Sequence, residues 1–412
     1  MTMIPFDEAL RKILTNLPPS SFEEVDFRHA SGRVLAEPLT ATCSIPPFSK
    51  SAVDGYALRT GDIEAVPATL ELMGEIRAGD TASLLVGPGQ AAAVMTGAPV
   101  PRGADAVQMM ECAAITDDGA GIRILERVRP GENIIPAASE ASLGQVVLTA
   151  GRLIGPAETA ALATFGHVRV RVYRRPTVAI MATGSELVEA DQVPPPHGIR
   201  NSNSCCLAAQ LRLLGLEGEY IGIARDERNH LRERLETGLL RDVLLVSGGV
   251  SVGAYDFVEE ILRELGLEVI FSKVAIRPGK PTLFARKYGK LVFGLPGNPV
   301  STFVSFELFV RAALGRLIGF ARPDLPRVQG SLASRITQKA GRTSFLPASV
   351  VWRSEGWQIH PLPWKGSSDI IGFSRADGLV VFPAGRDVME AGDKAEALLL
   401  PDYWQRQMTN DG

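Results

Sequence analysis

Three stretches of the sequence decide the fold: TVAIMATGSE (177–186), DVLLVSGGVSVG (242–253) and LVFGLPGNP (291–299). Each begins with a short apolar run and passes directly into a loop that contains glycine. Short apolar runs that end in turn-forming residues are typical of buried β-strands. We therefore interpret the three stretches as strands of one sheet, each with a glycine loop at its carboxyl end.

Helical patterns separate these strands. We predict helices over 204–215, 227–239, 257–266 and 300–319, with Asp226 as the cap of the second, and further strands over 219–224 and 268–276. Alternating strands and helices predict a mainly parallel, doubly wound α/β domain with helices on both faces of the sheet. We assign this domain to residues 176–323.

The regions on either side are rich in short β-prone segments. Residues 56–139 predict a small β-rich domain, and residues 324–406 predict a C-terminal β-barrel or sandwich. Residues 4–17 have apolar residues at helical spacing. We group 1–55 with 140–175 as a discontinuous N-terminal domain. The expected fold class is α/β plus β in a multidomain chain, which the length of 412 residues also favours.

The composition is that of an ordinary globular protein, with 45% apolar and 22% charged residues and a net charge of −3. No basic run is present, so we expect neither nucleic acid nor a membrane surface as a partner. The N-terminus lacks the pattern of a signal peptide, and no apolar run approaches the roughly 18 residues of a membrane span. The four cysteines have no CxxC spacing. We therefore expect a cytoplasmic protein with reduced cysteines.

The carboxyl ends of parallel strands meet at one edge of a sheet, where α/β proteins bind their ligands. The candidate binding residues at this edge are Thr183, Gly184 and Ser185 in the first loop, Ser247, Gly248, Gly249, Ser251 and Gly253 in the second, and Pro296, Gly297 and Asn298, with Ser301 beyond them, in the third. Glycine lets backbone amides approach an anion, and a helix N-terminus favours negative charge. One such loop is often an ordinary turn, whereas three at one edge favour a phosphate-binding pocket. The nucleotide motifs GxGxxG, after the first strand, and GxxxxGK[ST] are absent.

Cations are predicted at the same edge. Arg277, Pro278, Gly279 and Lys280 follow the predicted strand over 268–276, which itself carries Lys273. Cations together with glycine amides suit phosphate or another oxyanion. The alternative is that these residues are solvated surface charges.

Four carboxylates, Asp54, Glu186, Asp226 and Asp256, lie in or beside predicted loops. Acidic side chains next to a phosphate repel it unless a divalent cation lies between them, and Mg²⁺ binds a few carboxylates together with water and phosphate oxygens. Asp226 and Asp256 also stand where aspartate caps helices, and Asp54 lies in a turn, so structural roles stay open. The five histidines are scattered without metal-ligand spacing.

The order of these motifs resembles that of a known family. Between Pro5 and about Leu400 the chain carries, in this order, SAVDGYA, MTGAPVPRGADAVQMME, ATGSEL, SGGVSVGAYDF, RPGKP and GLPGNPVSTFVSFE. This set is similar to that of the molybdopterin molybdenumtransferases, which include MoeA and the gephyrin E-domain. The resemblance implies an elongated homodimer of four-domain subunits, in which the α/β domain of one subunit faces the first β-rich part of its partner. It also implies Mg²⁺-dependent insertion of molybdate into adenylylated molybdopterin with release of AMP.

The resemblance further implies roles for individual residues. Functional positions of the family fall on Asp54, Thr96, Glu186, Asp226, Asp256, Lys273 and Arg277, the last where the family often has lysine. A basic position and a cofactor-binding serine of the C-terminal domain fall on Arg342 and Ser367. The implied metal ligands are Asp54, Glu140, Glu186 and Asp256, and molybdate is expected near Asp54 and the amides of Thr96 and Gly97. The implied protein partners are a molybdopterin adenylyltransferase and client molybdoenzymes.

One segment departs from the family pattern. Where the family usually reads GxNIRxxGED, this chain has GENIIPAASE (131–140), so Ile135 replaces an arginine and Glu140 an aspartate. Pro347 also stands where arginine is common. The lost cation leaves open a tungstate-preferring paralogue or a non-catalytic protein that binds and delivers the cofactor. A pterin adenylyltransferase or related nucleotide hydrolase is a further alternative, which the β-rich flanking regions disfavour. The sequence leaves open the metal preference, the client enzyme and the role of Cys205 and Cys206.

Overall fold

The computed structural model of the chain describes residues 2–81, 83–249 and 257–409. The chain forms two compact units. The first combines Met1–Val25, Gly32–Ala36 and Arg171–Gly412, and the second combines Asp26–Ser31 and Glu37–Val170. The finer division into four domains stays a prediction. None of the helices in the described ranges is long and apolar enough to cross a membrane.

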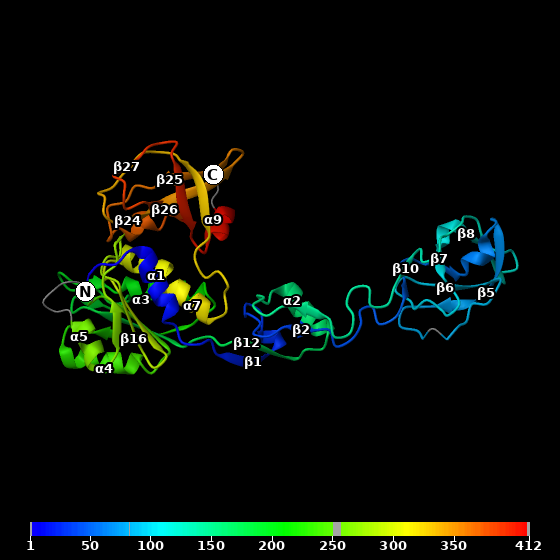
Figure 1. The fold of residues 1–412 in the computed structure, drawn as a ribbon, viewed down its shortest axis with the longest axis horizontal. Coiled ribbons are helices and arrows are strands. Elements are labelled where there is room, and N and C mark those ends of the chain that lie inside the picture. The colour runs from blue at the N-terminus through cyan, green and yellow to red at the C-terminus, as the bar shows by residue number, and fades with distance from the viewer. Residues whose placement is uncertain (1, 82, 250–256, 410–412) are drawn as a thin grey trace. The chain divides into compact units, whose positions relative to one another are not determined.

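A six-stranded sheet lies within the first unit (Figure 1). Its strands are, in spatial order, β16 (Gly218–Ala224), β13 (Val178–Thr183), β17 (Val243–Ser247), β21 (Lys290–Leu295), β20 (Leu283–Lys287) and β18 (Glu268–Phe271). The first four run parallel, and the last two pairings are antiparallel. Ala182, Ser247 and Leu295 lie side by side in register. The mainly parallel sheet is thus confirmed, and the carboxyl ends of β13, β17 and β21 do meet at one edge.

Alternate side chains of β13 enter two separate cores. On one face, Val178 and Ile180 share a core with helices α1 (Phe6–Thr15), α3 (Ser202–Arg212), α6 (Pro299–Ser305) and α7 (Arg311–Leu317). On the other face, Ala179 and Met181 share a core with α4 (Arg228–Gly238) and α5 (Phe257–Glu264) (Figure 1). Because successive side chains of a strand point to opposite faces, this alternation explains the continuous apolar run of β13. Helices cover both faces, as predicted.

Helix α1 packs against residues from the last third of the chain. Ala9 and Ile13 are fully buried in one cluster with Leu314 of α7. The ring centroid of Phe6 lies 5.7 Å from that of Phe309 and 5.2 Å from that of Phe345. The N-terminal segment is therefore part of the core of the first unit.

Two predicted elements are wrong in detail. The strand predicted over 268–276 ends at Phe271, and a separate strand β19 (Ile276–Arg277) pairs with β24 (Thr343–Arg353) of another sheet, so Lys273 lies in the connection between them. The predicted helix over 300–319 contains a π-helical turn, Phe306–Val310, between α6 and α7.

Strand β20 was not predicted. It pairs with β21 through a two-residue turn, in which Tyr288 and Gly289 have φ values of 45° and 80°. Two positive φ values are what a type I′ hairpin requires. The charged residues around this turn interrupt the apolar pattern, so a prediction based on apolar runs misses the strand pair.

Asp226 is not the cap of α4. The N-cap residue is Glu227, whose side chain makes no capping hydrogen bond. Asp226 Oδ2 instead accepts a hydrogen bond from Ser185 N at 3.0 Å, and Ser185 Oγ accepts one from Asp226 N at 3.2 Å. Asp226 therefore ties the loop after β16 to the loop after β13.

The other large sheet of the first unit closes into a barrel. Strands β24, β25 (Gly356–Pro361), β22 (Arg327–Leu332), β28 (Lys394–Leu399) and β26 (Gly378–Phe382) follow one another, and β26 pairs back with β24. The barrel core contains Leu346, Val350, Ile359 and Val380. Of the two predicted forms, barrel and sandwich, the closed pairing selects the barrel.

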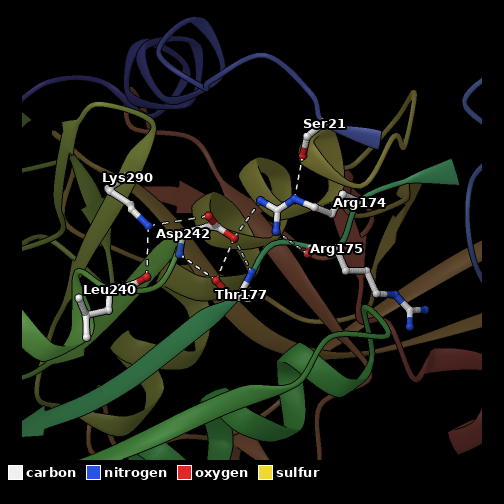
Figure 2. A network of polar contacts seen from close by, with 7 residues as sticks. All are labelled: Ser21, Arg174, Arg175, Thr177, Leu240, Asp242 and Lys290. Carbon is white, nitrogen blue, oxygen red and sulfur yellow. Dashed lines mark hydrogen bonds and ion pairs between the residues drawn. The ribbon is translucent and has the colours of Figure 1, made fainter. Parts of the chain in front are cut away.

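A polar network anchors the amino end of the parallel strands (Figure 2). Asp242, just before β17, accepts hydrogen bonds from Thr177 N, Thr177 Oγ1 and Arg174 Nη2 at 2.8–3.0 Å. Lys290 Nζ lies 3.9 Å from Asp242 Oδ1. Burial alone would raise the pKa of Asp242, but the bonds from Thr177 and Arg174 hold it below its usual value. The network joins the starts of three neighbouring strands, at the edge opposite the glycine loops.

The second unit contains a third six-stranded sheet. Its order is β7 (Ala106–Met109), β4 (Gly55–Leu58), β6 (Gln90–Val94), β5 (Ala68–Ile76), β9 (Gly121–Ile124) and β8 (Ala113–Ile115). A Cβ on Gly55 would lie 2.1 Å from Gln108 O, so only glycine fits directly after Asp54. The unit also contains α2 (Pro156–Thr164). Apart from Gly55, this sheet lies within residues 56–139, the region predicted to be β-rich.

Further short elements complete the description. They are β1 (Phe22–Asp26), β2 (Leu39–Thr40), β3 (Lys50–Ser51), β10 (Ile134–Ile135), β11 (Val146–Leu148), β12 (Arg169–Tyr173), β14 (Leu187–Val188), β15 (Ile199–Arg200), β23 (Ile336–Thr337), β27 (Val388–Met389), α8 (Ile370–Phe373) and α9 (Tyr403–Thr409). Among them, β14 and β15 form a parallel pair in the segment between the first glycine loop and α3.

Candidate functional site

A cleft of about 860 Å³ lies in the first unit at the carboxyl edge of β13, β17 and β21. Its volume is in the range of small-molecule sites. The predicted residues that line it are Thr183, Glu186, Ser247, Arg277, Pro278, Gly279, Lys280, Pro296, Gly297, Asn298, Ser301, Arg342 and Ser367. The structure thus brings together all three glycine loops, the RPGKP segment and part of the barrel.

Other predicted residues lie elsewhere. Gly184, Ser185, Gly248, Gly249, Asp226 and Lys273 do not line the cleft. Asp54, Thr96 and Glu140 belong to the second unit. Ser251, Gly253 and Asp256 fall outside the residues that the structure describes.

Thr183, the last residue of β13, carries a buried hydroxyl. The residue is 5% exposed, and its Oγ1 has no hydrogen-bond partner among the described residues. Gly248 and Gly249 pack directly on it, since a Cβ at Gly248 would lie 2.4 Å from Thr183 O and one at Gly249 2.6 Å from Thr183 Oγ1. Buried polar atoms in proteins nearly always have a partner. This hydroxyl is therefore an unpartnered polar atom, among the described residues, that the second glycine loop covers beside the cleft.

The N-terminus of α3 contributes lining residues that sequence reasoning missed, among them Asn201 and Asn203. Asn201 Oδ1 accepts a hydrogen bond from Ser204 N at 3.2 Å and so caps the helix. Asn203 Nδ2 donates to Ser247 Oγ at 2.8 Å and to Gly297 O at 2.7 Å, which links the second and third glycine loops. The signal was present, because asparagine and serine are favoured at helix N-caps and NSNS (201–204) leads into the predicted helix.

Four cations line the cleft without an acidic partner. Arg200, Arg277, Lys280 and Arg342 form no ion pair with a described residue, and Arg277 Nη1 donates to Gln338 Oε1 at 2.9 Å. Burial, together with the positive charge of Arg277, lowers the pKa of Arg342. Uncompensated cations attract anions, and the guanidinium fork matches phosphate-like oxyanions.

A loop of the barrel closes one side of the cleft. Ser367 Oγ accepts a hydrogen bond from Asn298 Nδ2 at 2.9 Å, and Ser367 O accepts one from Val300 N at 3.0 Å. These bonds hold the loop against the start of α6. The loop also supplies Trp364, a lining residue that was not predicted.

Glu186 is the one carboxylate among the described lining residues. It is exposed, and its side chain forms no hydrogen bond or ion pair with a described residue. The described ranges contain no group of three or more His, Cys, Asp or Glu residues that could hold a metal. Because Mg²⁺ often takes one or two protein carboxylates and completes its shell with water and phosphate oxygens, Glu186 fits a site of that kind.

Asp54 and Thr96 are in contact in the second unit. Thr96 N and Oγ1 donate to Asp54 Oδ1 at 2.6 and 2.8 Å, and these bonds lower the pKa of Asp54. Gly97 N donates to Ser51 O at 2.9 Å. The two amides near which molybdate is expected are thus hydrogen-bonded within the protein, and the molybdate site stays a prediction.

Cys206 in α3 is expected to resist thiol reagents. Burial, followed by the negative charge of Glu307, raises the pKa of this thiol to about 12, whereas Cys43 and Cys205 are exposed. Because the thiolate is the reactive form, iodoacetamide at about pH 8 should modify Cys43 and Cys205 first and Cys206 only after unfolding. Peptide mass spectrometry measures the order. Equal labelling of Cys205 and Cys206 in the native protein would contradict the prediction.

Comparisons with known families cover most of the chain. Residues 4–166 match the MoeA N-terminal region (domain I and II), residues 179–316 match a probable molybdopterin binding domain, and residues 329–400 match the MoeA C-terminal region (domain IV). The fold and the cleft thus define a multidomain protein built around an α/β domain of molybdopterin-binding type.

Full-length relatives agree with this class. The chain is 34% identical over 407 residues to the molybdopterin molybdenumtransferase of Staphylococcus aureus (strain Mu50), covering 96% of this chain and 95% of the relative. It is 35% identical over 406 residues to that of Bacillus subtilis (strain 168), covering 97% and 94%. A solved structure of the molybdopterin biosynthesis MoeA protein from Pyrococcus horikoshii matches with a TM-score of 0.85 at 32% identity, covering 97% of this chain and 99% of that one. The chain belongs to the molybdopterin molybdenumtransferase (MoeA) family, which confirms the resemblance seen in its motifs.

Proposed function

We propose that the chain inserts molybdate into adenylylated molybdopterin and releases AMP in a reaction that needs Mg²⁺. The observation that carries this proposal is the group of Arg277, Lys280 and Arg342, which line the cleft without an acidic partner among the described residues. Such a group suits oxyanion substrates, and both molybdate and the phosphates of the adenylylated pterin are oxyanions. The names of the bacterial relatives support the same reaction class.

The lining residues divide into two roles in this proposal. The cations hold the oxyanions and stabilise the negative charge that develops as water attacks the phosphoanhydride, so that one phosphate leaves in AMP and the other stays on the pterin. Gly297 and the start of α6, which line the cleft, orient the phosphate. Glu186 would help to hold Mg²⁺, which would supply charge neutralisation for a bound phosphate. Catalysis here is electrostatic positioning more than proton transfer.

The remaining implied residues belong to the same proposal. We infer that Asp54, Thr96 and Glu140 act on the metal or molybdate from a partner chain in a homodimer, and that Asp256 completes the metal ligands. The support for these roles is that Asp54, Thr96 and Glu140 lie in the range that matches the MoeA N-terminal region, and Asp256 in the range that matches the probable molybdopterin binding domain. We also infer a cytoplasmic protein that receives its pterin from a molybdopterin adenylyltransferase and passes the product to client molybdoenzymes.

Reconstitution tests the proposed reaction. Purified protein receives adenylylated molybdopterin, Mg²⁺ and either molybdate or tungstate, and AMP release is followed by chromatography, with EDTA as the metal-free control. AMP release that needs both Mg²⁺ and molybdate supports the proposal. AMP release with tungstate alone points to a tungstate-preferring paralogue, and tight pterin binding without AMP release from either metal oxide points to a delivery protein.

A further inference from the structure

Trp364 places an aromatic ring in the wall of the cleft. Of the lining residues that the structure describes, it is the one aromatic side chain. It is partly buried, and it packs against both the α/β core and the barrel core. The ring is thus supported by protein from two sides while it still borders the cleft.

The loop that carries Trp364 is held in place by hydrogen bonds from backbone amides. Asp369 Oδ2 accepts a hydrogen bond from Lys365 N at 2.8 Å, and Asp369 Oδ1 accepts one from Gly372 N at 2.9 Å. Two residues before Trp364 in the sequence, Leu362 N donates to Pro347 O at 2.9 Å. A ring fixed before a ligand arrives loses little conformational freedom on binding, which favours affinity.

The same loop brings the ring close to the anion-binding parts of the cleft. Ser367, three residues beyond Trp364, bonds to Asn298 and Val300 at the start of α6. No described residue accepts a hydrogen bond from the indole N–H of Trp364. A tryptophan that stands beside phosphate-binding loops is suited to stack on a planar heterocycle, because every nucleobase presents a π-face.

We propose that Trp364 is the platform on which a planar ring of the substrate stacks while the neighbouring cations hold the attached phosphate. This inference rests on the proposed function, because adenylylated molybdopterin carries a planar ring on each side of its phosphates, adenine on one and the pterin on the other. Trp364 thereby selects substrates with a heterocycle at a set distance from the phosphate and rejects a bare sugar phosphate.

Equilibrium binding measurements distinguish the contribution of the ring to the affinity from that of the phosphate. Isothermal titration of the full chain uses AMP, neopterin monophosphate and ribose 5-phosphate, of which the last has the phosphate without a heterocycle. Trp364→Ala should weaken AMP or neopterin monophosphate about tenfold or more and change ribose 5-phosphate less than about twofold. Trp364→Phe should retain most of the affinity and Trp364→Leu little of it, because leucine is apolar but has no π-face.

Trp352→Ala serves as the matched control. Trp352 is 62% exposed and does not line the cleft, so its loss should leave all three affinities unchanged. Loss of AMP affinity alone identifies adenine as the stacked ring, and loss of neopterin affinity alone identifies the pterin. The inference is overturned if Trp364→Ala binds both ring compounds like the wild type, if Trp364→Leu binds as well as Trp364→Phe, or if all three ligands weaken together. It is also overturned if the wild type binds neither ring compound better than ribose 5-phosphate. The proposed reaction is judged separately by AMP release.

Discussion

Arg342→Met is expected to lower the rate of AMP release about a hundredfold or more. Arg342 lines the cleft without an ion pair to any described residue. Burial and the neighbouring charge of Arg277 lower its pKa, so the two cations repel each other until an anion lies between them. Methionine keeps the apolar stem of the side chain and removes its charge and its donors. The large effect is expected because the lost donors act where negative charge develops.

Two variants make this prediction specific. Arg335→Met is the matched control, because Arg335 also belongs to the barrel but is exposed, lies 3.5 Å from Glu390 and does not line the cleft. Its rate should stay within about twofold of the wild type, since exposed ion pairs contribute little. Arg342→Lys should fall between the two, because lysine keeps a point charge but lacks the planar fork. A normal rate in Arg342→Met would remove Arg342 from the site.

Arg311→Met is expected to destabilise the first unit by about 3–5 kcal/mol, because it leaves a buried carboxylate without its cation. Arg311 is 7% and Glu307 2% exposed, and the two form an ion pair one helical turn apart. Gln210 Nε2 donates to Glu307 Oε1 at 2.7 Å. In the variant, Gln210 is therefore the main partner that the Glu307 carboxylate keeps. Calorimetry measures the effect as a lower midpoint of the unfolding transition that includes α7.

A second pair and a double variant control for the loss of the side chain itself. Lys12 and Glu8 of α1 have the same spacing but are partly exposed, with 3.7 Å between their charged atoms, so Lys12→Met should cost less than about 1 kcal/mol. Adding Glu307→Gln to Arg311→Met should recover a large part of the lost stability, because the unpaired charge is gone. If the double variant is as unstable as the two single changes added together, the buried charge is not the cause.

The fold was predictable where a single physical signal dominated. Strands β13, β17 and β21 are buried on both faces, so each is a continuous apolar run that the sequence displays directly. Strand β20 escaped prediction because its register depends on a hairpin turn at Tyr288 and Gly289, which the charged residues around it obscure. Asp226 precedes a helix, which favours a cap, but Ser185 N competes for its carboxylate. That competition depends on two loops that are distant in the sequence.

The candidate site was predictable in its parts more than in its assembly. The glycine loops and the RPGKP segment follow from the rule that ligands bind beyond the carboxyl ends of parallel strands. The contribution of Trp364 does not follow from this rule. Only the closure of the barrel and the bond between Asn298 and Ser367 place the loop that carries Trp364 beside α6. A sequence motif also does not show that the amides of Thr96 and Gly97 donate hydrogen bonds to Asp54 and Ser51.

The packing of α1 has a consequence for synthesis of the chain. Ile13 and Leu314 share one core although about 300 residues separate them, and the whole second unit is translated in between. At ribosomal rates of roughly 5–20 residues per second, the apolar face of α1 waits for about 15–60 s before its partner emerges. During that interval the helix is an uncovered apolar surface on a nascent chain. We expect the core that contains α1 to form only after α7 has emerged from the ribosome.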